Sequence, residues 1–63
     1  MSNLETLIYI LKEDIAELEW DITLTSYLSS NKSPRLLGLR KVLKELEKRL
    51  EIKEKELEEE KNE

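Results

Sequence analysis

The residue types that usually carry catalysis or bind metals are nearly absent from this 63-residue chain. It has no His and no Cys, so the commonest metal ligand and the thiolate nucleophile are both missing. Its serines have no visible base, and its single Gly cannot build a phosphate-binding loop, which needs several. The 15 acidic residues follow a surface pattern, so we expect no acid–base catalysis. The sequence predicts a protein that is not an enzyme and needs no metal or other cofactor.

The charged residues fall into three blocks along the chain. Residues 1–21 carry six acids and one base, residues 32–50 seven bases and two acids, and residues 51–63 seven acids and three bases. One interpretation is that an acidic helix pairs with a basic helix in an antiparallel hairpin. The other is that one flank of the basic helix is a charged contact face for an acidic partner such as nucleic acid. That contact face would consist of Arg40, Lys41, Lys44 and Lys48. The net charge of −4 and the acidic end of the chain weigh against nucleic acid.

The aromatic residues lie where a helix normally carries charge. At 100° per residue, Tyr9, Trp20 and Tyr27, with Leu24, point away from the apolar seam of the first predicted helix. Trp and Tyr are enriched at binding hot spots because they bury large areas and keep a polar group. We therefore predict that Tyr9, Trp20, Leu24 and Tyr27 bind a protein partner or support higher-order self-assembly. The alternative is that these are scattered exposed residues, or that Trp20 and Tyr27 fold over the end of a bundle.

Two long helices are predicted to position these side chains in one domain, residues 1–63. The first covers about residues 3–28, and Ser2 with Glu5 forms a capping box at its start. A loop at 29–33 separates it from a second helix over about residues 34–60, which Ser33 caps and Pro34 begins. Gly38 indicates either a loosened first turn or a close approach to a partner. An acidic tail extends to residue 63, and residues 58–63 are expected to be solvated and frayed.

Each predicted helix has apolar residues at alternating intervals of three and four, the heptad pattern of packed helices. When the helices are aligned antiparallel, the two seams pair in layers whose residue numbers sum to 61, as for Leu18 with Leu43. One layer pairs Ile8 with Lys53, and another pairs Thr25 with Leu36. The predicted core of the bundle consists of Leu4, Ile8, Leu11, Ile15, Leu18, Ile22, Leu36, Leu39, Leu43, Leu46, Leu50 and Leu57.

A domain of this size is marginal alone and usually needs a disulfide, a metal or a partner subunit. Leu7, Leu28 and Val42 widen the apolar side of the seams beyond what a two-helix contact covers. The predicted fold class is therefore all-α: an antiparallel helical hairpin, related to a coiled coil, that dimerises into a four-helix bundle. A bundle completed by a different protein is the alternative. The longest apolar run, residues 7–11, is far too short to span a bilayer, and we expect a cytoplasmic protein that does not bind membranes.

The whole chain resembles a small hairpin protein of the spindle-shaped viruses (fuselloviruses) that infect hot-acid archaea. The shared features are the length, the Cys-free composition rich in Lys, Glu and Leu, and two long helices around residues 29–34. The absence of Gln, Cys and His is also typical of thermophile proteins. The resemblance implies a dimeric four-helix bundle with a non-enzymatic, adaptor-like role in the host cytoplasm. It assigns no functional residues.

The sequence thus favours a viral adaptor, a homodimer that docks an unidentified protein partner. A small nucleic-acid-binding regulator and a structural or assembly component are the alternatives.

Overall fold

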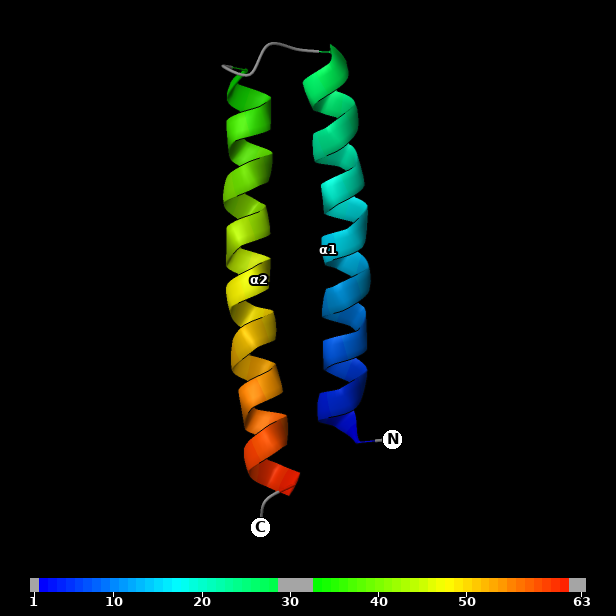
Figure 1. The fold of residues 1–63 in the computed structure, drawn as a ribbon, viewed down its shortest axis with the longest axis vertical. Helices are drawn as coiled ribbons and strands as arrows, with labels where there is room; N and C mark the ends of the chain where they lie inside the picture. The colour runs from blue at the N-terminus through cyan, green and yellow to red at the C-terminus, as the bar shows by residue number, and fades with distance from the viewer. Residues whose placement is uncertain (1, 29–32, 62–63) are drawn as a thin grey trace.

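The computed structural model describes residues 2–28 and 33–61, and these form two α-helices. Helix α1 is Asn3–Leu28 and helix α2 is Pro34–Lys61. They lie side by side and run antiparallel over almost their whole length (Figure 1), so the two described ranges form a helical hairpin measuring 49 × 16 × 11 Å. Neither range contains a strand, and the all-α prediction is confirmed. Most of the predicted loop, residues 29–32, and the final two residues of the tail lie outside the described residues.

Local sequence signals set the start of each helix. The Ser2 hydroxyl accepts a hydrogen bond from the Glu5 backbone N–H at 3.2 Å, which satisfies one of the free amides at the start of α1. At the second start, the carbonyl of Ser33 accepts from the Leu37 N–H at 3.1 Å. Pro34 is the first residue of α2, where its fixed φ suits a helix and its missing N–H costs nothing.

Most of the predicted core is only half-buried in one copy of the chain. The buried apolar residues of the described ranges are Ile8, Ile15 and Leu36. The other predicted core residues have intermediate exposure: Leu4, Leu11, Leu18, Ile22, Leu39, Leu43, Leu46, Leu50 and Leu57. Each helix covers only part of the other's apolar stripe, which is why so few side chains are fully enclosed.

The helices lie within about a turn of the register that the seams predict. Leu18 shares a hollow with Val42 and Leu46, the residues on either side of its predicted layer partner. Leu11 likewise lies between Arg49 and Lys53. Across the other side of the hairpin, the Lys12 ammonium lies 3.9 Å from the Glu54 carboxylate.

The end of α2 lies close to the predicted one, at about residue 60. The helix continues through Glu58, Glu59 and Glu60 to Lys61, and all four residues are exposed. Lys61 is a base in the last turn, where a positive charge interacts favourably with the helix dipole.

Candidate interaction surfaces

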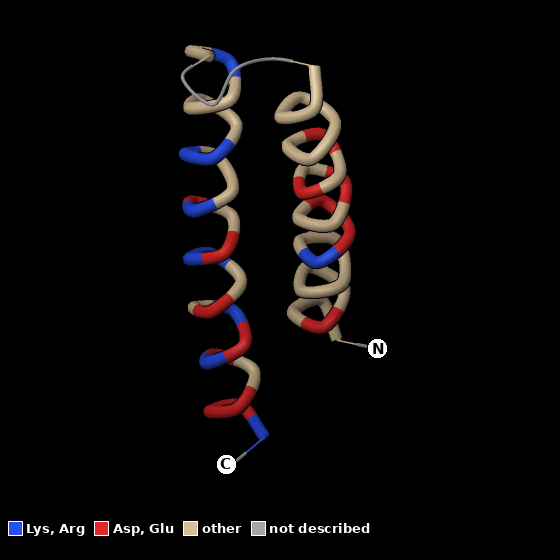
Figure 2. Tube along the Cα trace, turned by 45° about the horizontal axis from the view of Figure 1, so that its top comes forward, with Lys and Arg blue, Asp and Glu red and all other residues tan. Residues whose placement is uncertain are grey.

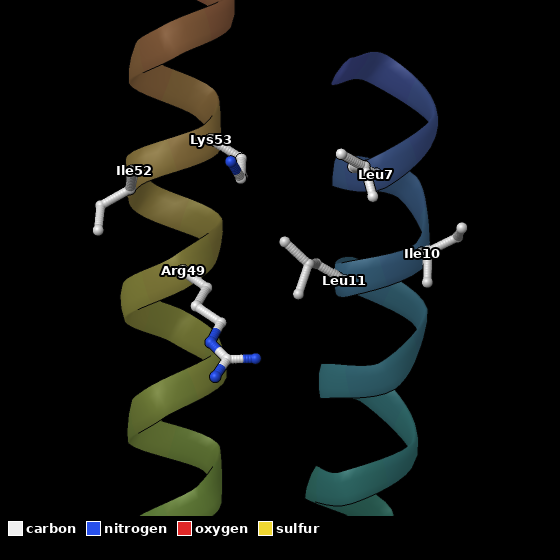
Figure 3. Close-up of a pocket in the computed structure, with 6 residues that line it drawn as sticks. All are labelled: Leu7, Ile10, Leu11, Arg49, Ile52 and Lys53. Atoms are coloured by element: carbon white, nitrogen blue, oxygen red, sulfur yellow. The ribbon is translucent and has the colours of Figure 1, made fainter. Parts of the chain in front are cut away.

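One broad side of the hairpin carries three hollows in a row between the helices. The first holds about 460 Å³ and is lined by Leu7, Ile10, Leu11, Arg49, Ile52 and Lys53 (Figure 3). The second is lined by Asp14, Glu17, Leu18, Asp21, Val42 and Leu46. The third is lined by Asp21, Leu24, Thr25, Leu28 and Arg35. On α1 the lining residues Leu7, Asp14, Asp21 and Leu28 are seven apart, so the three hollows lie on one side of the hairpin, which we call the groove face.

Apolar side chains are exposed along this groove face. Six of the ten large hydrophobic residues that are exposed in the described ranges lie here: Leu7, Ile10, Leu24, Leu28, Val42 and Ile52. The α1 side has apolar residues near both ends, and between them lie three acids, Asp14, Glu17 and Asp21. Large exposed apolar surfaces are rare on monomeric proteins, so the apolar residues at the two ends of the groove face mark it as a candidate interaction site.

The opposite broad side of the hairpin is polar. By heptad position, its flanking residues in α1 include Glu5, Lys12 and Glu19, and in α2 they include Arg40 and Glu47. The Lys12–Glu54 pair bridges the helices there, but both side chains are more than half exposed, so the pair contributes little to stability. The two sides therefore differ in apolar character, and the groove face is the more apolar one.

All three aromatic side chains are exposed on α1. The exposed fractions are 60% for Tyr9, 64% for Trp20 and 83% for Tyr27. Trp20 and Tyr27 are seven residues, or two turns, apart on the outer side of the helix. Leu24, predicted to belong with them, is 42% exposed and lines the third hollow, so it lies at the boundary between the aromatic side and the groove face.

Acidic residues lie near two of the three aromatic side chains of α1, Tyr9 and Trp20, whereas no described residue within one turn of Tyr27 is acidic. Figure 2 shows the acids spread along the middle of this helix, with one base, Lys12, among them. Glu13, one turn beyond Tyr9, raises the pKa of the Tyr9 phenol, first through a hydrogen bond that favours the neutral hydroxyl and second through its negative charge. The phenol of Tyr9 therefore remains neutral and able to donate a hydrogen bond over the whole physiological range.

The predicted charged contact face is exposed on α2. Arg40, Lys41, Lys44 and Lys48 all have exposed side chains. The ion pairs formed within the described ranges are Lys12–Glu54 and Lys53–Glu56, and neither involves these four residues. Glu45 and Glu47 interrupt the run of bases, however, and Figure 2 shows only bases over the first turns of α2, with acids mixed among the bases from about its middle onward.

Part of the groove face was not predicted from the sequence. Leu7, Leu28 and Val42 were predicted to flank the seams, whereas Ile10 and Ile52 were not. Around the helix, both isoleucines lie next to the flanking residues, on the side away from the seam. A residue at this place becomes part of an apolar interface only if a third helix packs against it. The available signal was that Ile10, Leu24 and Ile52 share this heptad position.

The structure provides no constellation typical of a metal site. Within residues 2–28 and 33–61, no group of three or more acidic side chains comes close enough to hold a metal ion. Neither described helix has the length and apolar character that crossing a membrane requires. Comparison with known proteins gives no relative: no family model matches the chain, and no curated protein or solved structure is significantly similar to it.

Proposed function

We propose that the chain is a non-enzymatic protein-interaction module that acts as a homodimeric four-helix bundle and docks another protein. The observation that carries this proposal is the distribution of apolar surface. Ten large hydrophobic side chains of the described ranges are exposed, whereas three are buried. A chain that folds alone gains its stability by burying such residues, so this hairpin has surface to offer to partners.

The exposed apolar residues divide into two surfaces with different roles. The groove face adjoins the half-buried seams, so covering it completes the core of a bundle. The aromatic side of α1, with Tyr9, Trp20 and Tyr27, points away from that core and stays accessible after dimerisation. This second surface docks the partner protein, and Leu24 contributes at its edge. Acids around Tyr9 and Trp20 favour a partner that presents basic and apolar side chains.

The experiment that tests partner docking is affinity capture with a double variant, Trp20→Ala with Tyr27→Ala. The variant should keep its helical circular dichroism and its dimer mass, because both side chains are exposed, and it should lose the captured protein. The matched control is Leu37→Ala, which removes a 56% exposed leucine from α2 and should keep the captured protein. Unfolding of the double variant, or equal capture by all three proteins, contradicts the docking role.

A nucleic-acid-binding regulator is the second candidate, supported by the charged contact face on α2, which is exposed and forms no ion pair with any residue of the described ranges. Such binding depends steeply on salt, because phosphate contacts release counterions. A chain that binds phosphates through Arg40, Lys41, Lys44 and Lys48 should shift the gel mobility of duplex DNA or RNA at low salt. The net charge of −4 makes this the weaker proposal. An assembly component would instead form oligomers beyond the dimer as concentration rises.

The resemblance to spindle-shaped virus proteins would place this adaptor in the cytoplasm of an infected archaeal cell. That part of the proposal depends on length, composition and the two-helix pattern alone.

A further inference from the structure

We infer that a second copy of the chain covers the groove face, with the two loops at the same end of the bundle and α1 of each copy against α2 of the other. This inference rests on the homodimer in the proposed function and specifies its interface and orientation. It follows from the size of the groove face, from the geometry of two-fold symmetry and from the order of charged and apolar residues along the two helices.

The groove face has the dimensions that a stable dimer requires. The broad side of the hairpin measures 49 by 16 Å, and a typical specific interface buries roughly 800 Å² on each partner. Six exposed apolar side chains and the outer edges of the seam leucines lie on this side. The opposite side is dominated by charged residues, so the groove face is the side on which burial gains free energy.

Two-fold symmetry leaves two ways to place one groove face on another. If the axis runs along the helices, the loops meet at the same end, and α1 of each copy lies on α2 of the other; we call this the same-end arrangement. If the axis runs across the helices, the loops lie at opposite ends, and each α1 lies on the partner's α1; we call this the opposite-end arrangement. Both arrangements give a bundle with antiparallel neighbours, so side chains decide between them.

The opposite-end arrangement brings like charges together. Matching the apolar ends of α1 with those of the partner places Leu7 at the level of the partner's Leu28. The same alignment places Asp14 at the level of the partner's Asp21 and puts the two Glu17 side chains opposite each other. Six carboxylates then lie in the centre of a newly buried interface, where like charges are destabilising and desolvation is costly.

The same-end arrangement separates the two sets of acids and matches the apolar residues. Within one hairpin, a residue of α1 lies level with the residue of α2 for which the two residue numbers sum to about 61. Because the two-fold axis runs along the helices, the partner's α1 lies at the same height. The same sum therefore gives the levels of contacts between the copies. Ile52 therefore lies between the levels of the partner's Leu7 and Ile10, which gives an apolar contact. At the other end, the partner's Leu24 lies at the level of Gly38, where an added Cβ would meet no atom within 4 Å, so the surface is open there.

Charges also pair better in the same-end arrangement. Arg49 lies within about one turn of the partner's Asp14, close enough for the guanidinium to reach the carboxylate. Figure 3 shows Arg49 reaching over the gap between the helices, on the side where this contact would form. Glu45 near the partner's Glu17 is the remaining like-charge pair, compared with the six-carboxylate cluster of the other arrangement.

Disulfide trapping between single-cysteine variants tests this orientation. The chain has no Cys of its own, so each variant carries one thiol. Ile10→Cys protein is co-refolded with Ile52→Cys protein, and separately with Leu24→Cys protein, in a glutathione redox buffer. The same-end dimer gives the Ile10→Cys/Ile52→Cys heterodimer as the main disulfide product. The opposite-end dimer gives the Ile10→Cys/Leu24→Cys product instead. The control is Lys44→Cys, which is exposed and outside the groove face. When co-refolded with Ile10→Cys protein, it should form no disulfide heterodimer in either arrangement.

Each outcome distinguishes this inference from the function on which it rests. The Ile10→Cys/Ile52→Cys heterodimer supports the inference. The Ile10→Cys/Leu24→Cys heterodimer overturns the orientation but leaves the homodimer in place. A dimeric mass by sedimentation equilibrium with neither product shows that another face dimerises, which also overturns the inference. A monomeric mass for the unmodified chain at all concentrations overturns both the inference and the proposed homodimer.

Discussion

At the scale of single residues, adjacent side chains of the same type differ widely in their exposed fraction. Leu36 and Leu37 are adjacent leucines at the start of α2, yet Leu36 is 0% exposed and Leu37 is 56% exposed. Helical geometry turns neighbouring side chains by 100°, so one lies in the seam and the other outside it. Leu36 is also the only side chain in the described ranges that is fully enclosed. The stability of the hairpin should therefore depend on one leucine far more than on its neighbour.

We expect Leu36→Ala to lower the free energy of unfolding by roughly 2–5 kcal/mol, because it removes enclosed methyl groups and leaves a cavity. Leu37→Ala, the matched control, should change the free energy by no more than about 0.5 kcal/mol. Urea unfolding followed by circular dichroism, at one fixed protein concentration, measures both. Equal effects at the two positions would show that the start of α2 packs differently.

Tyr9 and Glu13 are a second pair whose interaction can be measured directly. Glu13 raises the pKa of the Tyr9 phenol. Because the folded pKa lies above the unfolded one, this contact stabilises the fold at pH values below the ordinary tyrosine pKa. The stabilisation is lost as the pH rises through the folded pKa. The side chain is exposed, so the effect on stability is small, but the titration itself is observable.

We expect Glu13→Ala to lower the pKa of Tyr9, because the substitution removes both the hydrogen bond and the negative charge. Spectrophotometric titration of the phenolate measures this pKa, and Tyr27→Phe in both proteins leaves Tyr9 as the single tyrosine. If the titration curves with and without Glu13 coincide, the interaction between the two side chains is absent.

At the scale of elements, the sequence predicted the helices well because each signal was local. Ser2 and Pro34 act at the helix starts, and the heptad spacing follows from the period of a helix. The three hollows of the groove face, and the place of Ile10 and Ile52 in it, were not predicted. Whether a flanking residue joins an interface depends on the approach of another helix, and local spacing does not contain that information.

Lys53 is the exception within the α2 seam. Its predicted partner Ile8 is buried, whereas Lys53 itself is half-buried, lines the first hollow with Leu7 and Leu11, and directs its ammonium to Glu56 at 3.4 Å. An exposed pair between residues i and i+3 contributes only a few tenths of a kcal/mol. The charge therefore interrupts the apolar seam with little electrostatic compensation.

We expect Lys53→Leu to raise the free energy of unfolding by about 1 kcal/mol, because a leucine buries apolar area against Ile8 and Leu11. Lys55→Leu is the control, since Lys55 is exposed and outside the seam, and should give no comparable gain. Thermal unfolding of both variants beside the parent chain provides the comparison. A loss of stability for Lys53→Leu would contradict the register in which Lys53 faces Ile8.

At the scale of the whole molecule, the hairpin has an organised shape but an incomplete core. The described helices enclose three apolar side chains and leave ten large ones exposed, six of them on the groove face. Domains this small rarely hold together on one thin core, and this chain has no cysteine with which to form a disulfide. In the homodimer that we propose, a second copy supplies the missing layer, and two-fold pairing needs only one self-complementary face. In that proposal the aromatic side of α1 remains as the surface that docks a partner.

Sedimentation equilibrium of the unmodified chain, over a hundredfold range of concentration, tests this account most directly. We expect a mass twice the 7.5 kDa of one chain, with dissociation and loss of helical signal occurring together on dilution, because one copy cannot enclose its own seam. A mass of 7.5 kDa at every concentration, with full helical signal, would show that the lone hairpin is stable and would contradict the account.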